Sequence, residues 1–255
     1  MSLVISALPG IPIIHTGDDL VEIIWNGLVN ANINLQEGDI LVLAQKIVSK
    51  AEGRWENLAS IQPTIQAIGL AKKTEKDARL IELVLRESNQ VIRYRIGTII
   101  VEHRLGFICA NAGIDHSNAA GDGDTTEEWV LLLPEDPDKS STIIRKQLEA
   151  RSGFHLGVMI IDSHGRAWRE GVVGVAIGLS GIPGLVDMRG KRDIFGYTLK
   201  YTTIGAADEL AAAASLVMGQ ANEATPIVHV RGFPYPLRNG SLIELLRPKE
   251  QDLFR

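Results

Sequence analysis

The sequence predicts an α+β fold with mixed and antiparallel sheets and flanking helices. Segments that read as strands and helices follow one another without the regular βαβ alternation of a doubly wound sheet. The glycine-rich stretch from Gly171 to Gly184 matches neither the P-loop nor the dinucleotide-binding fingerprint, so the common nucleotide-binding folds are not supported. With 255 residues, 45% of them hydrophobic, the chain can bury the core of one large domain or two smaller ones.

Composition narrows the class of protein. Aromatic residues make up only 5% of the chain and the net charge is -5, which argues against a nucleic-acid-binding surface. The single cysteine, Cys109, cannot form a disulfide within the chain and suits a reducing compartment. The apolar N-terminus lacks the basic flank of a signal peptide, and no run is long enough to span a membrane. We therefore expect a cytoplasmic protein that binds neither nucleic acid nor membrane.

The N-terminal part of the chain predicts one helix between two extended segments. Pro12 disfavours a helix before it, so residues 10–14 are expected to be extended. Thr16 reads as the N-cap of a helix, with Asp19 at the third helical position. The continuous apolar run over residues 40–44 then predicts a buried strand.

The middle of the chain predicts helices and strands in turn. Apolar residues at helical spacing predict an amphipathic helix over residues 75–88. Residues 91–101 alternate and then become apolar, which predicts a strand running toward a hairpin near Arg104. A short strand over residues 129–133 is closed by a proline, and capping residues at both ends predict a helix over residues 136–153.

The C-terminal half adds strands around one clear helix. The helix is expected over the Ala-rich residues 206–218, which carry two acidic residues in the favourable first turn. The glycine-rich stretch predicts a strand whose backbone approaches another chain or a ligand, and the tail over residues 237–255 predicts a short helix. Strands are expected at residues 157–161, 171–184, 198–204 and 227–230.

The segment from Asn111 to Asn118 gathers several reactive groups. It combines a glycine turn, the Asp115 carboxylate, an imidazole, a hydroxyl and two amides. A carboxylate beside hydroxyl and carbonyl oxygens suits Mg²⁺ or Mn²⁺ with a phosphate, because these ions prefer oxygen ligands. The same residue types are also ordinary turn formers, so a turn without chemistry is the alternative.

A second stretch repeats this pattern. The apolar residues 157–161 lead into Asp162, Ser163 and His164. Two strand-end loops that each carry an Asp can converge on one cation, so we predict a shared oxygen-ligand site, although either Asp alone could form a turn. The sequence offers no His-x-x-x-His or Cys partner for a closed zinc site, so His116 and His164 are expected to orient ligands or face solvent.

A polar and cationic cluster follows the strand predicted at residues 40–44. Hydroxyl and cationic side chains directly after a buried strand could bind phosphate, and a solvated turn is the alternative. The members of the cluster are Gln45, Lys46, Ser49, Lys50 and Arg54.

Several of these motifs occur in an order that is typical of a known family. They are Gly38–Val42 with Ile47–Arg54, Asn111–Asn118, Leu132–Asp138, and Asp162–Arg166 with Gly171–Gly178. Together they resemble the coenzyme F420-0:L-glutamate ligase family, and the resemblance runs from Gly10 to Gly232. It implies a single ligase domain over residues 1–255, which two α+β subdomains could make up, and an intertwined homodimer with the nucleotide in a groove. Some bacterial members carry a fused nitroreductase-like domain, but this chain ends at Arg255, so flavin-dependent reduction is not expected.

The resemblance also implies an activity. Members of the family form an amide between L-glutamate and the deazaflavin F420-0 in coenzyme F420 biosynthesis, using GTP and Mg²⁺ or Mn²⁺, with K⁺ assisting. A carboxylate must be activated before it can become an amide, most simply as an acyl phosphate formed by attack on the terminal phosphate of the nucleotide. The glutamate amine then attacks that acyl phosphate, and His116 and His164 are candidates for removing its proton.

The resemblance assigns roles to individual residues. Metal binding is implied for Asp115, Asp162, Ser163 and Gln220. Catalysis would use Asp115 and Asp162, with Lys50 or a nearby arginine stabilising the transferring phosphoryl group. Positions 45 and 46 vary within the family, so contacts there could run through the backbone. Nucleotide contacts are implied for Ile11, Pro12, Ile13, Ile14, Gln45, Lys46, Lys50, Asn118, Met218, Gly219, Gln220, Ala221, Asn222, Glu223, Ala224 and Thr225.

Two other functions are compatible with the same residues. A non-catalytic deazaflavin-binding or nucleotide-binding protein would bind its ligand without turnover. A metal-dependent phosphohydrolase would release phosphate without needing glutamate or F420-0. The metal-binding and cationic positions favour the ligase over both.

Overall fold

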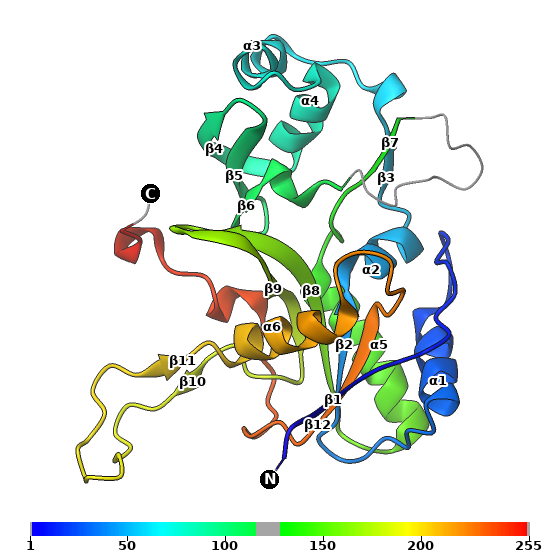
Figure 1. The fold of residues 1–255 in the computed structure, drawn as a ribbon, viewed down its shortest axis with the longest axis vertical. Coiled ribbons are helices and arrows are strands. Elements are labelled where there is room, and N and C mark those ends of the chain that lie inside the picture. Colours follow the sequence, from blue (N-terminus) through cyan, green and yellow to red (C-terminus); the bar gives the residue numbers. More distant parts are fainter. Residues whose placement is uncertain (1, 116–127, 254–255) are drawn as a thin grey trace.

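A five-stranded mixed sheet forms the centre of the molecule (Figure 1). The computed structural model describes residues 2–115 and 128–253. Strands β2 and β8 pair in parallel, and the other three pairs are antiparallel. The strands predicted at residues 40–44, 157–161 and 227–230 all belong to this sheet. In spatial order the strands are β1 (Val4–Ala7), β12 (Ile227–Arg231), β2 (Ile40–Ala44), β8 (Gly157–Arg166) and β9 (Arg169–Ser180).

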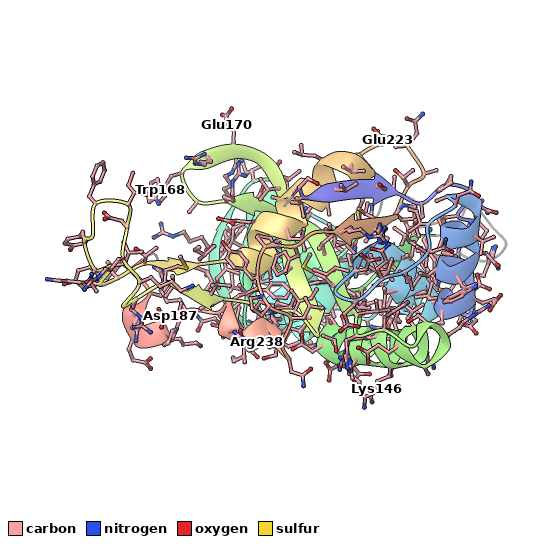
Figure 2. All side chains as sticks on the ribbon, turned by 90° about the horizontal axis from the view of Figure 1, so that it is seen from below. Lys146, Trp168, Glu170, Asp187, Glu223 and Arg238 are labelled. Carbon is pink, nitrogen blue, oxygen red and sulfur yellow. The ribbon has the colours of Figure 1, made fainter. Side chains whose placement is uncertain are left out.

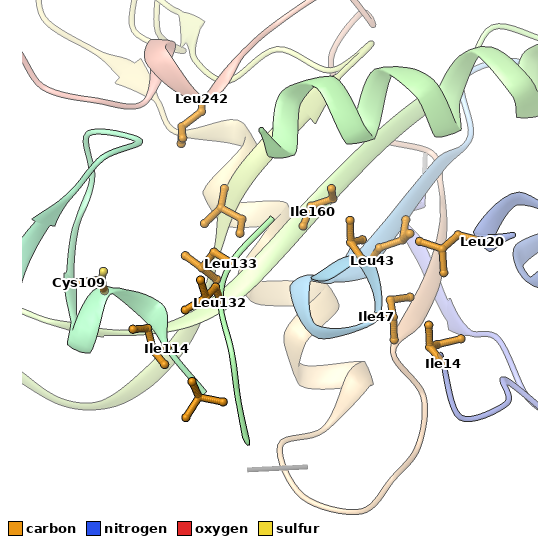
Figure 3. Packing of buried hydrophobic residues seen from close by; sticks show 14 of the residues in the cluster. Ile14, Leu20, Leu43, Ile47, Cys109, Ile114, Leu132, Leu133, Ile160 and Leu242 are labelled. Atoms are coloured by element: carbon orange, nitrogen blue, oxygen red, sulfur yellow. The ribbon is translucent and has the colours of Figure 1, made fainter. Parts of the chain in front are cut away.

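The two faces of this sheet pack against different hydrophobic clusters. Successive side chains of a strand point to opposite faces, so Leu41 and Leu43 of β2 join a first cluster while Ile40 and Val42 join a second. Figure 3 shows part of the first cluster, including Leu43. Helices α1 (Leu20–Asn30) and α5 (Pro137–Ser152) contribute to the first cluster, and α6 (Ala206–Met218) covers the second.

A lobe of helices and short strands extends from the first face of the sheet (Figure 1). Its antiparallel sheet comprises β4 (Ser88–Arg95), β5 (Thr98–His103) and β6 (Ile108–Ala110). Helices α3 (Ile65–Thr74) and α4 (Ala78–Arg86) pack beside it. Helix α2 (Gln45–Ala51) and the pair β3 (Trp55–Asn57) and β7 (Trp129–Leu131) lie between the lobe and the central sheet.

The remaining elements lie toward the C-terminus. Strands β10 (Val186–Asp187) and β11 (Thr203–Ile204) begin and end an arm that projects from the molecule (Figure 1). The tail contains the 3₁₀ turns Leu242–Glu244 and Lys249–Gln251, so the short helix predicted for it is wrong. Among the described residues, no helix combines the length and apolar character that crossing a membrane requires.

Two predicted helix boundaries are corrected. Asp19, predicted inside the first helix, is its N-cap, because its Oδ1 accepts the N–H groups of Val21 and Glu22 at 2.9 and 3.1 Å. The predicted helix over residues 75–88 begins only after Asp77. Glu75 is the left-handed C-cap of α3, a helix that the apolar pattern did not indicate.

Two predicted strands are also corrected. Residues 91–101 form a hairpin rather than one strand, because Gly97 has a φ of +77° and the chain reverses before Thr98. Only residues 203–204 of the predicted strand 198–204 are paired as a strand. The hairpin predicted near Arg104 is confirmed by the antiparallel pairing of β5 with β6.

The glycine-rich strand β9 lies against two helices of the same chain. A Cβ placed on Gly174 would lie 2.6 Å from the carbonyl oxygen of Ala211 in α6, and one on Gly178 would lie 2.5 Å from the backbone of Pro137 in α5. Strand β9 contains a register shift opposite Ile160 and Ile161 of β8. The shift reverses the alternation of β9 residues between the two faces of the sheet, so Gly174 and Gly178 face opposite sides. At Gly174 and Gly178 the close approach is thus made to helices of the same chain, and not to another chain or a ligand as predicted.

We expect the substitution Gly178→Ala to lower the free energy of unfolding by about 1 to 3 kcal/mol, because the new methyl group overpacks against a backbone that cannot move aside cheaply. Urea unfolding followed by circular dichroism measures the change. Gly165→Ala in β8 is the matched control, because no atom lies within 4 Å of its added Cβ. Equal stability of the two variants would contradict this account.

Candidate active site

The carboxyl end of the β2–β8 pair brings several predicted residues to one edge of the sheet. Ala44 of β2 is paired in register with Ile161 of β8. Lys46 therefore follows one strand and Asp162 continues the other from the same level. Helix α2 begins directly after β2 and carries most of the polar and cationic cluster, although the sequence pattern predicted no helix here. The segment after α6 returns to the same edge, since the N–H of Ala44 donates to the carbonyl of Pro226 at 2.9 Å.

Asp115 reaches this edge from the lobe. Its backbone pairs with Leu131 of β7 through two hydrogen bonds of 2.9 and 3.0 Å. Its carboxylate Oδ2 lies 3.1 Å from the Nζ of Lys46, and both side chains remain partly exposed, at 25% and 32%. The structure thus brings together a predicted metal ligand and a predicted nucleotide-binding residue from distant parts of the sequence.

A left-handed turn sets the direction in which the chain enters Asp115. Asn111, Ala112 and Gly113 have φ values of 51°, 54° and 66°. This conformation is costly for non-glycine residues and is typically retained where the surrounding structure imposes it. A Cβ on Gly113 would lie 2.6 Å from the Leu133 side chain, so the turn also packs tightly.

Asp162 and Ser163 lie within strand β8, not in a loop after it. The strand continues to Arg166 because its second half pairs with β9, so the prediction of a strand-end loop here is wrong. Neighbouring residues of a strand point to opposite faces. Ser163 Oγ donates to Gln220 Oε1 at 2.9 Å, and Gln220 Nε2 donates to Ser215 of α6 at 2.9 Å.

Asp162 belongs to the other face, beside the lobe. Its Oδ2 lies 3.0 Å from His164 Nε2, and the Asp162 side chain is only 14% exposed. Burial raises the pKa of the Cys109 thiol to about 12, and the negative charge of Asp162 contributes to that rise. Cys109 lies in β6, which leads into the turn before Asp115. The four residues predicted to bind metal are therefore divided, with Asp162 beside the segment that leads to Asp115 and Ser163 paired with Gln220 under α6.

The residues predicted to contact nucleotide differ in their exposure to solvent and in their contacts. Gln45 is buried and accepts a 3.0 Å hydrogen bond from Ser49 Oγ. The Nζ of Lys50 lies 5.7 Å from the centre of the Trp55 ring, a cation–π contact that the sequence did not indicate. Ile13 is 77% exposed whereas Ile14 is buried.

Hydrogen bonds also hold two further segments that are predicted to bind nucleotide. Residues 11–14 lead to Gly17, whose N–H donates to the carbonyl of Ala51 at the end of α2. The loop over residues 218–225 is closed by a 2.9 Å bond from Thr225 Oγ1 to the carbonyl of Met218. Asn118 and His116, both predicted to have functional roles, lie outside the described residues.

Arg54 has a different environment from the other members of the cationic cluster. Its Nε donates to the carbonyl of Leu133 at 2.9 Å, and its Nη2 lies 3.2 Å from the buried carboxylate of Glu87. Arg104 binds the same carboxylate at 3.0 Å. The Arg54 guanidinium thus connects the turn after α2 to the lobe, a role that the sequence could not indicate because Glu87 is 33 positions away.

Comparison with known proteins places these features in a family. The model of the F420-0:gamma-glutamyl ligase family matches residues 10–232. The chain belongs to this family. A coenzyme F420:L-glutamate ligase of Methanothermobacter thermautotrophicus is 45% identical over 100% of both chains. Enzymes of the same name from Methanopyrus kandleri and Archaeoglobus fulgidus are 44% and 38% identical, covering 95% and 100% of this chain and 93% and 97% of their own.

The four side chains predicted to bind metal can be tested for their fit to a divalent cation. Asp115, Asp162, Ser163 and Gln220 offer carboxylate, hydroxyl and amide oxygens, the donors that Mg²⁺ and Mn²⁺ prefer. Within residues 2–115 and 128–253, no three His, Cys, Asp or Glu side chains gather in a way that could hold a metal ion. The donor types therefore suit a hard cation, while the side chains that carry them lie on both faces of β8.

Cys109 is expected to react slowly in the folded protein. A pKa of about 12 leaves its thiolate fraction near neutral pH about a thousandfold below that of an ordinary cysteine, and the reaction rate should rise with pH. Titration with a chromogenic disulfide reagent, with and without urea, measures this difference. Equal rates in both conditions would show that the thiol is neither buried nor shifted.

Proposed function

We propose that this protein is a GTP-dependent and divalent-metal-dependent coenzyme F420-0:L-glutamate ligase. The observation that carries the proposal is the 3.1 Å ion pair between Lys46 and Asp115 beside the carboxyl end of the β2–β8 pair. It joins the cationic helix α2 to a carboxylate at the edge where β8 carries Asp162. Membership of the family over residues 10–232, and relatives named for this activity, support the same assignment.

The proposed reaction has two steps. A carboxylate oxygen of F420-0 attacks the terminal phosphorus of GTP, forming an acyl phosphate and releasing GDP. The amine of L-glutamate then attacks the acyl carbon, forming the amide and releasing phosphate. Both steps develop or transfer negative charge on phosphate oxygens, so fixed cations near those oxygens accelerate them.

The cationic residues of α2 suit the first step. Lys46 and Lys50 lie four positions apart in α2, so their side chains project from the same side of the helix. Lys50 would stabilise the transferring phosphoryl group, while Lys46 would bind the nucleotide and pair with Asp115. The contact of Lys50 with Trp55 limits the positions its ammonium can take.

The oxygen donors suit divalent cations on both faces of β8. Asp115 and Asp162 would hold one cation, and Ser163 with Gln220 would contribute on the side of α6. A bound Mg²⁺ or Mn²⁺ would neutralise charge on the nucleotide phosphates. The residues themselves fix the direction of approach, because Asp115 is held by its backbone pairing and Asp162 by the strand. K⁺ would assist as a monovalent cofactor.

Activity of the purified protein tests this proposal. We expect phosphate release from GTP in the presence of Mn²⁺ only when F420-0 and L-glutamate are both present, with a product heavier by one or more glutamyl units in mass spectra. Phosphate release without those substrates would indicate a phosphohydrolase. Ligand binding without turnover would indicate a non-catalytic binding protein.

Asp115→Asn should lower this turnover by about a hundredfold or more, because an uncharged amide is a weaker ligand for a cation and a weaker partner for Lys46. Melting temperature checks that the fold is retained. Glu250→Gln makes the same chemical change at an exposed position near the C-terminus and should leave turnover unchanged. Full activity of Asp115→Asn would exclude the proposed role of this carboxylate.

We further propose that the protein forms a homodimer through the arm between β10 and β11. Ile194, Phe195 and Tyr201 on this arm are 92%, 90% and 88% exposed. Figure 2 shows the arm extending well away from the rest of the chain. Large apolar side chains gathered on a projecting segment favour burial against a partner, and symmetric pairing of identical chains is the commonest solution.

Ile194→Asp should shift the protein from dimer to monomer, because a carboxylate would be buried in the interface. Light scattering after size-exclusion chromatography measures the mass. Ile65→Asp introduces the same charge at a residue of α3 that is 90% exposed, and should leave the mass unchanged. A monomeric wild-type protein, or a dimer that survives Ile194→Asp, would contradict this proposal.

A further inference from the structure

His164 lies in a constrained environment on strand β8. Its side chain is 10% exposed, and its Nε2 lies 3.0 Å from Oδ2 of Asp162. The two residues are two positions apart in the strand, so both side chains point to the same face. Exposed histidines without a role are common, but a partly buried histidine paired with a carboxylate on the same strand requires a physical account.

The hydrogen bond fixes the roles of its two atoms. An ionised carboxylate can only accept hydrogen bonds, so Nε2 of His164 must carry the hydrogen and donate it to Asp162. One carboxylate oxygen, Oδ2, is thereby engaged, and rotation of the carboxylate about its bond to the rest of the side chain is restricted. A carboxylate held in one orientation binds a cation with less loss of conformational freedom.

Aromatic packing holds the His164 ring itself. The ring of Phe107 lies 5.2 Å away, tilted by 46°. Phe107 is in turn stacked on His103, with ring centres 5.0 Å apart and planes within 3° of parallel. His103 is fully buried and its Nδ1 accepts the N–H of Leu105 at 3.1 Å. A row of three rings therefore connects the lobe to Asp162.

The charge of Asp162 faces the same part of the lobe. The negative charge of Asp162 contributes to the raised pKa of Cys109, which lies two residues after Phe107 in the chain. The Asp162 carboxylate therefore lies near β6, on the face of its strand that is turned toward the lobe.

We propose that His164 is a positioning residue that orients the carboxylate of Asp162 for binding a divalent cation. The proposal rests on the proposed function, since it assigns Asp162 a cation. It adds a residue outside the predicted oxygen ligands, with Phe107 as the support of its ring. His164 acts through Asp162 and does not itself contact the cation.

Two amide substitutions that differ only in reach test this inference. In His164→Gln the side-chain amide nitrogen can occupy the place of Nε2 and donate to Asp162. In His164→Asn the same amide is one carbon shorter and falls short of Oδ2. Binding of Mn²⁺ to the purified full-length protein is measured by electron paramagnetic resonance, without GTP, F420-0 or glutamate.

We expect His164→Asn to weaken Mn²⁺ binding by about 10- to 100-fold and His164→Gln to stay within about threefold of the wild type. His155→Asn is the matched control, because the His155 side chain is 86% exposed and should not affect the affinity. Phe107→Leu keeps the donor but removes the ring contact, and should weaken binding by less than His164→Asn does. Melting temperatures confirm that each variant is folded.

Equal Mn²⁺ affinity of His164→Asn and the wild type would overturn the inference, and so would equal losses in the Asn and Gln variants, which would indicate ring packing alone. Wild-type protein that binds no Mn²⁺ would overturn it as well. The outcome is separate from the ligase assay. If the Asn and Gln variants differ as expected while the wild type forms no glutamyl product, the positioning role stands and the proposed activity fails.

Discussion

The parallel pairing of β2 with β8 is the constraint on which the rest of the structure depends. Residues 40–44 and 157–161 are paired in strict register, and all but one of these ten residues are buried. Because both strands run in the same direction, the residues that follow them emerge at one edge. The positions of α2 and of Asp162 both follow from this pairing. A slip of one residue would turn each buried side chain to the opposite face.

Strand β8 continues beyond that edge, so the residues of the candidate site lie on both faces of the strand. If the chain had turned after Ile161, as turn-forming residues suggested, Asp162 and Ser163 could have faced the same cation. Pairing with β9 keeps them in a strand and directs them apart. One face is then completed by the lobe and the other by α6 and Gln220. The lobe and α6 therefore both contribute to the candidate site, although they lie on opposite faces of the sheet.

Sequence patterns predicted the elements whose signals are local and strong. The apolar run 40–44 and the helix 206–218 were found at their observed bounds, and the helix after Asp136 was found within one residue. The hairpin turn at Gly97 was missed because apolar residues continue on both sides of it. Such a reversal depends on the conformation of one glycine rather than on composition.

The sequence could name candidate residue types for the site but not the geometry that brings them together. The pairing of Lys46 with Asp115 joins segments that are 69 positions apart, so spacing along the chain could not reveal it. Likewise, the local preference of Asp-Ser-His-Gly for a turn is overridden by the ladder with β9. The environments of Arg54 and His164 depend on Glu87 and Phe107, which only the folded lobe brings near.

The order of strands has a consequence for how the chain is made. Strand β12 lies between β1 and β2, so the first two strands of the chain do not pair with each other. Each of them pairs instead with β12, the last strand along the chain. During synthesis, the ribosome must release residues up to Arg231 before this half of the sheet can close. Until then the apolar strand β2 has one edge without its native partner, which exposes a nascent chain to misassembly. Completion of the sheet is therefore a late event in translation, and a chain that ends before β12 would lack the strand that joins its two halves.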